Sequence, residues 1–139
     1  MTAGGTYTLM IELGAPSAVT FGAAGERELS PGWYAYTGSA LGSGGFARVD
    51  RHYRLASGEH DARHWHVDSL LGHPDARLDA DVRSPGVDAE CAVAGEIART
   101  TGPVAGVGAT DCDCGSHLAF APSRRPLARA VRRAHEAAR

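Results

Sequence analysis

The sequence contains no lysine, no asparagine and no glutamine, so its fourteen basic side chains other than histidine are all arginines. Loss of AT-rich codons in a GC-rich genome explains such a bias, and arginine abundance by itself therefore says little about phosphate binding. The absence of asparagine also excludes any active site that depends on that side chain.

Long apolar runs and a secretory leader are missing as well. No run reaches the roughly 20 residues that a membrane-spanning helix needs, and the first residues, MTAGGTYTLMIEL, lack a basic start and a cleavage site. Two of the three cysteines are separated by a single residue, which makes a poor disulfide framework and agrees with a reducing compartment. We therefore expect a cytoplasmic protein without a membrane partner.

The chain of 139 residues fits a single domain that buries roughly two-thirds of its unfolded surface. Its net charge of -2 argues weakly against a protein that coats nucleic acid, but the charge is uneven, with six arginines and one glutamate in residues 122–139. We predict a main domain over residues 1–121 and a basic helical extension over residues 122–139. The extension either adds nonspecific phosphate contacts or is a frayed, solvated end.

Alternating apolar residues predict several strands, and helical spacing with turn residues predicts several helices. The predicted strands are a half-buried strand at 6–13 with Tyr7 on its apolar face, a hairpin at 18–29, and strands at 33–38, 77–83 and 118–121. The predicted helices lie at 46–56, stopped by Gly58, at 64–71, at 89–100 with Asp88 as N-cap, and at 127–138. Strands and helices mix without a βαβ period, so we expect an α+β domain whose small mixed or antiparallel sheet is flanked by helices.

One stretch, residues 32–54, joins a strand to a helix through a glycine-rich turn. Such a turn lets backbone amides approach a ligand closely, and arginines one helical turn later suit an anion such as phosphate. An ordinary turn in which the glycines only permit the bend accounts for the composition equally well.

Further motifs occur in a fixed order around this stretch. They are GTY at residues 5–7, YAYTGSA at 34–40, RVDRH at 48–52, HWHVD at 64–68, Glu90-Cys91, and DCDCGSHL at 111–118. The ordered set resembles the GIY-YIG nuclease superfamily, in which two such tripeptides lie on neighbouring strands and a helical arginine follows. It is closer still to an uncharacterised archaeal and bacterial branch of that superfamily.

The resemblance implies a GIY-YIG-like fold and hydrolysis of a nucleic-acid phosphodiester, DNA more than RNA, with one Mg²⁺ or Mn²⁺ ion. Tyr7 would help to deprotonate the attacking water, directly or through a relay, and Tyr36 would position that water or the phosphate. Arg48 would stabilise negative charge on the phosphate. Glu90 would hold the metal ion, since hard cations prefer carboxylate oxygen.

Two further groups of residues complete the predicted site. His52 and His66 are candidates for general-base work. The candidate contacts to nucleic acid are Gly38, Ser39, Arg51 and Arg54.

His52, His64, His66 and Asp68 form a further cluster of candidate site residues, in and before the HWHVD motif. His64 and Asp68 are four residues apart and share a helix face, so a histidine oriented by a carboxylate, or a two-ligand metal edge, is geometrically available. A solvated polar face with Trp65 anchoring the core is the alternative.

Cysteines suggest a possible zinc site. Cys112, Cys114 and His117, joined by Cys91, offer four suitable ligands. Their spacing is not a standard zinc pattern, and small thiols are often buried, so packing is favoured over zinc. Metal analysis of the purified protein distinguishes the two.

Two other functions stay open on the sequence. In one, the protein keeps the fold and binds nucleic acid without cleaving it, so the arginines matter and Glu90 does not. In the other, the histidine, aspartate and cysteine side chains form a different metal site that acts on a small molecule, and the tyrosines belong to the core.

Overall fold

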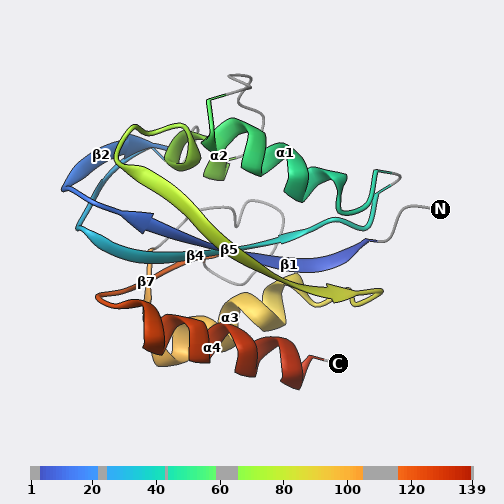
Figure 1. Ribbon diagram of the computed structural model, residues 1–139. Helices are drawn as coiled ribbons and strands as arrows, with labels where there is room; N and C mark the ends of the chain where they lie inside the picture. Colours follow the sequence, from blue (N-terminus) through green and yellow to red (C-terminus); the bar gives the residue numbers. More distant parts are fainter. Residues whose placement is uncertain (1–3, 22–24, 43, 59–65, 105–115, 139) are drawn as a thin grey trace.

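The computed structural model describes residues 4–21, 25–42, 44–58, 66–104 and 116–138. Within these residues the chain forms a five-stranded sheet in the order β5-β1-β4-β7-β6, and every pairing in it is antiparallel. Helices α1 and α2 cover one face of the sheet, and α3 and α4 cover the other (Figure 1). The predicted α+β fold with an antiparallel sheet flanked by helices is confirmed.

The elements have the following bounds. The strands are β1 Gly5–Leu13, β2 Ser17–Thr20, β3 Glu26–Leu29, β4 Gly32–Ser39, β5 Ala76–Pro85, β6 Gly102–Pro103 and β7 Leu118–Ala121. The helices are α1 Ala47–Ala56, α2 His66–Leu71, α3 Glu90–Thr100 and α4 Arg124–Ala137. None of the helices in the described part of the chain is long and apolar enough to cross a membrane.

Strand β1 lies in the interior of the sheet, between β5 and β4. Its alternating residues Tyr7, Leu9, Ile11 and Leu13 face the core under α1 and α2, as the sequence predicts. The prediction that this strand is only half-buried is wrong, because Met10 on the other face packs into a second core. The buried polar residues on that face, Thr6 and Thr8, are small threonines, which a two-sided sheet can accommodate once their hydroxyls are hydrogen-bonded.

The layer above the sheet combines α1, α2 and the β2–β3 hairpin. Buried α1 residues recur at helical spacing, and the helix ends at Gly58, whose φ of 84° is the left-handed conformation that favours glycine after a helix. The hairpin, with strands β2 and β3 paired antiparallel as predicted, adds Val19, Phe21 and Leu29 to the same core.

The layer below the sheet is built from α3 and α4. The predicted cap of α3 is wrong: its N-cap position is Ala89, without a side-chain cap, and the Ala89 amide instead donates to Thr6 Oγ1 at 3.0 Å. On α4 a stripe of small and branched apolar residues is fully packed against the sheet, in the core that contains Met10. The helix predicted as an extension therefore supplies part of this core.

A buried polar network also joins α4 to the sheet. His135 Nε2 lies 2.8 Å from Thr8 Oγ1, and His135 Nδ1 lies 2.8 Å from Ser84 Oγ. Thr8 Oγ1 is in turn 3.0 Å from Thr37 Oγ1, so one hydroxyl connects β1, β4 and α4. Because buried polar groups are costly without partners, this network selects one position of α4 over the sheet.

We expect Thr8→Val to lower the free energy of unfolding by about 1–3 kcal/mol, because it keeps the side chain's shape but removes the hydroxyl opposite His135. Urea denaturation measures the change. Thr20→Val on the exposed side of β2 is the control and should change stability by less than about 0.5 kcal/mol. A Thr8→Val protein as stable as the wild type would show that the network does not hold α4.

Candidate functional site

The pairing of β1 with β4 brings two tyrosines together on the face covered by α1. Tyr7 lies opposite Gly38, and Leu9 lies opposite Tyr36. Since alternate residues of a strand share a face, Tyr7 and Tyr36 are diagonal neighbours on the same surface of the sheet. The two tripeptides of the sequence therefore meet at one end of this strand pair.

Gly38 is needed there for space. A Cβ at this position would lie 2.6 Å from Tyr7 Oη and 3.2 Å from Tyr36 Cε2. Both rings thus lie against the backbone of β4 where a side chain would stand. The glycine that the sequence marks as a nucleic-acid contact has, in the structure, the role of seating the tyrosines.

A chain of three buried polar groups runs from β1 through α1 to α2. The Tyr7 hydroxyl lies 2.9 Å from His52 Nε2, and His52 Nδ1 lies 3.3 Å from Asp68 Oδ1. The exposed fractions of the three residues are only 2%, 1% and 1%. A carboxylate accepts but does not donate, so we assign the imidazole proton to Nδ1, and Nε2 then accepts the hydroxyl proton of Tyr7.

The arginines of α1 are placed differently from one another. Arg48 donates to the carbonyl oxygen of Ser39, which holds its side chain at the end of β4. Arg51 lies 4.0 Å from Asp68 Oδ2, at the edge of the Tyr7–His52–Asp68 chain. Arg54 is exposed one turn further along the helix. Two of the three predicted arginines therefore lie beside the tyrosine site.

Glu90 reaches the same end of the sheet from the opposite layer. Thr6 Oγ1 donates to the Val87 carbonyl at 2.7 Å and accepts the Ala89 amide, which fixes the start of α3 against β1. Glu90, the first residue of α3, then lies 3.8 Å from His117 Nδ1. Cys91 Sγ lies 3.8 Å from the other ring nitrogen of His117, and burial lowers the pKa of that histidine.

Electrostatics link these groups. Burial is the main cause that raises the pKa of Tyr7 and of Tyr36. The negative charge of Glu90 and that of Asp68 raise both pKa values further, whereas the positive charge of Arg48 lowers them. The charges of Arg48, Glu90 and Asp68 therefore all act on both tyrosines, and both tyrosines are kept protonated at neutral pH.

Some predicted residues lie outside what the structure describes. These are the side chain of His66 and residues His64, Cys112 and Cys114. Among the residues described, no group of three or more histidine, cysteine, aspartate or glutamate side chains could hold a metal ion. The zinc hypothesis for Cys91, His117 and the two later cysteines stays a prediction.

Sequence reasoning missed two features of this site. It paired Asp68 with a histidine of its own helix, whereas the structure pairs it with His52 of α1. It also assigned no role to Thr6 and Thr37, although Thr6 anchors α3 and the Thr37 amide donates to the His117 carbonyl at 2.9 Å. Their position between the glycine and tyrosine of each tripeptide was the available signal.

Comparison with known proteins gives one family. The chain belongs to the family described as a domain of unknown function, DUF123, whose model matches residues 6–139. The match begins at Thr6, inside β1 and the first tripeptide, and includes the second tripeptide and α4. No curated protein and no solved structure matches the chain.

We expect Gly38→Ala to destabilise the protein by about 1–3 kcal/mol, because the new methyl group overlaps the Tyr7 hydroxyl. Gly42→Ala is the matched control, since a Cβ there meets nothing within 4 Å. Thermal or urea unfolding of both variants gives the comparison. Equal stability of the two would mean that Tyr7 can move away without cost.

All four tyrosines of the chain have raised pKa values, chiefly through burial, with that of Tyr34 raised to about 12. Ionisation therefore favours the unfolded state, so the stability these hydroxyls contribute is complete below pH 10.0 and is lost as the pH rises above it. A tyrosinate absorbance titration should show almost no ionisation near pH 10.0 in the native protein and about half ionisation there in denaturant. A native tyrosine that titrates at its ordinary value would contradict this.

Proposed function

We propose that the protein hydrolyses a phosphodiester bond of nucleic acid, DNA more than RNA, with the aid of one divalent metal ion. The observation that carries the proposal is the buried chain from the Tyr7 hydroxyl through His52 to Asp68, beside Tyr36 and Arg48. The resemblance of the ordered motifs to the GIY-YIG nuclease superfamily supports the same reaction.

The chain offers a route for a proton. With its own proton directed to His52 Nε2, the Tyr7 oxygen presents lone pairs to an attacking water. As the water attacks phosphorus, its proton passes to Tyr7, the hydroxyl proton passes to His52, and Asp68 stabilises the resulting imidazolium. Tyr7 never has to exist as a phenolate, which agrees with its raised pKa.

The remaining side chains act on the phosphate. Arg48 carries a planar guanidinium at the end of β4, where it can stabilise the negative charge that builds up on the phosphoryl oxygens. Tyr36 is a protonated hydroxyl beside Tyr7 and can donate to the phosphate or orient the water. Arg51, at the edge of the site, supplies a second positive charge.

Glu90 is the residue that would hold the metal ion. The Glu90 side chain is 29% exposed. Mg²⁺ is commonly held by one or two carboxylates together with waters and substrate phosphates. A single carboxylate at the edge of the site is therefore a sufficient protein contribution. The ion would neutralise phosphate charge.

Energetics favour a chemical role over a purely structural one. A buried chain of a phenol, an imidazole and a carboxylate contributes little to stability relative to apolar residues of the same shape. Tyr7 belongs to the hydrophobic core under α1 and α2. A structural role, like that of His135 in fixing α4, is the alternative, and the cleavage assay below distinguishes the two.

The test is cleavage of branched, nicked and single-stranded DNA in the presence of Mg²⁺ or Mn²⁺. We expect Tyr7→Phe to reduce the cleavage rate by roughly 10²–10⁴, because the proton route loses its first member. The matched control is Tyr34→Phe, which also removes one hydroxyl from a buried tyrosine of the same face but one bonded to the Ser30 carbonyl.

Loss of activity in Tyr7→Phe with activity retained in Tyr34→Phe would support the proposal. Equal activity of Tyr7→Phe and wild type would remove Tyr7 from the mechanism. Absence of cleavage by the wild type on every substrate and with both metals would reject hydrolysis itself.

A further inference from the structure

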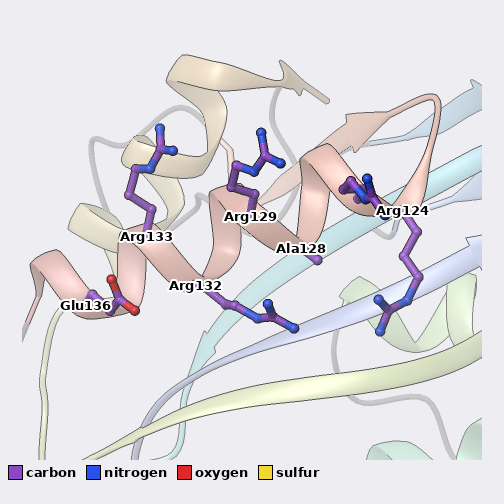
Figure 2. A pocket seen from close by; sticks show the side chains of 7 residues that line it. Arg124, Ala128, Arg129, Arg132, Arg133 and Glu136 are labelled. Atoms are coloured by element: carbon purple, nitrogen blue, oxygen red, sulfur yellow. The ribbon is translucent and has the colours of Figure 1, made fainter.

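The outer surface of α4 carries a dense group of arginines. Arg125, Arg129, Arg132 and Arg133 are all exposed, and together with Ala128 and Glu136 they line a hollow along the helix. We call these four residues the arginine face. Figure 2 shows Arg129 and Arg133 projecting side by side from the helix, with Arg132 on its other flank.

Internal contacts do not account for this group. Arg124, at the start of α4, is used within the fold: its Nε donates to Asp79 Oδ2 at 3.0 Å, and its guanidinium lies 5.8 Å from the centre of the Trp33 ring. Within the described structure, by contrast, no acidic side chain forms an ion pair with any residue of the arginine face. Among the described residues, these four charges therefore make no ion pair that would hold the fold together.

Their spacing makes the charges repel one another. Arg125, Arg129 and Arg133 follow at intervals of four residues, and like charges at that spacing on a helix are unfavourable. Glu136 is the single acid of α4, at its far end. A bound polyanion would relieve this repulsion, because its phosphates would place negative charge between the guanidinium groups.

The dimensions suit a sugar-phosphate backbone. From Arg125 to Arg133 the helix rises about 12 Å. Measured along the axis of a DNA duplex, this length contains roughly three to four phosphates of one strand. Guanidinium groups also match phosphate geometry through paired hydrogen bonds. The net charge of the chain is -2, so attraction of a polyanion must come from a local surface of this kind.

A membrane surface is a poorer match. An amphipathic helix binds lipid by inserting its apolar face, but the apolar face of α4 is buried against the sheet. Among the described residues the one large hydrophobic side chain that is exposed is Leu41, which is not on α4.

We propose that the arginine face of α4 binds the sugar-phosphate backbone of nucleic acid without reading its sequence. The surface lies on the opposite side of the sheet from Tyr7 and His52 (Figure 1), and it is distinct from the contacts proposed near the tyrosines. Binding here goes beyond the proposed hydrolysis, since it requires neither the tyrosines nor a metal ion.

The test measures binding of a short fluorescent DNA duplex at a series of salt concentrations without divalent metal. Arg129→Gln with Arg133→Gln should weaken binding on the order of 10- to 100-fold near 50 mM salt and reduce the salt slope by about 1.8. Arg27→Gln with Arg99→Gln is the matched control: it makes the same charge change on β3 and α3 and should alter affinity by less than about threefold. Thermal unfolding verifies that both variants are folded.

A variant that should tighten binding, rather than weaken it, makes the test more stringent. Glu136→Gln removes the acid at the end of the arginine face and should tighten binding. Because the assay contains no divalent metal and measures binding alone, its failure would leave the proposed hydrolysis standing, and failure of the cleavage assay would leave this inference standing. Equal weakening by the two double variants, or binding of the same arginines to phosphatidylserine vesicles but not to the duplex, would overturn it.

Discussion

The antiparallel register between β1 and β4 is the constraint on which the rest of the structure depends. It sets Tyr7 against Gly38, so that the tyrosine ring can lie across the neighbouring strand and beside Tyr36. A slip of one residue would move Tyr7 to the face covered by α3 and α4 and would bring Thr6 or Thr8 under α1. Neither the contact between Tyr7 and His52 nor the core beneath α1 would survive that change.

Successive residues of β1 connect the sheet to its two layers through buried histidines. Tyr7 contacts His52 of α1, and the next residue, Thr8, contacts His135 of α4. The first pair ends in a carboxylate and is suited to moving a proton, whereas the second ends in hydroxyls and is suited to fixing a helix. One strand thus carries the proposed site on one face and the support of α4 on the other, and the arginines of α4 face outward.

The site itself combines both layers at one end of the sheet. Thr6 holds the start of α3 in place, and this brings Glu90 close enough for its charge to act on both tyrosines. The threonines within the two tripeptides therefore hold neighbouring segments in place: Thr6 holds the start of α3, and Thr37 bonds to Thr8 and to the His117 carbonyl. This end of the sheet therefore combines a tyrosine pair from one face with a carboxylate from the layer that covers the other face.

Local chemistry was sufficient to predict most elements of this protein. Alternation placed Tyr7 on an apolar face, and Gly58 ended α1, because both depend on residues close in the chain. The partner of Asp68, the packing of α4 and the anchoring of α3 by Thr6 could not be read in this way. Contacts of this kind join residues far apart in sequence: Tyr7 and His52 are 45 positions apart, and Thr8 and His135 are 127 positions apart. Only the packing of helices on both faces of one sheet decides which of these residues meet.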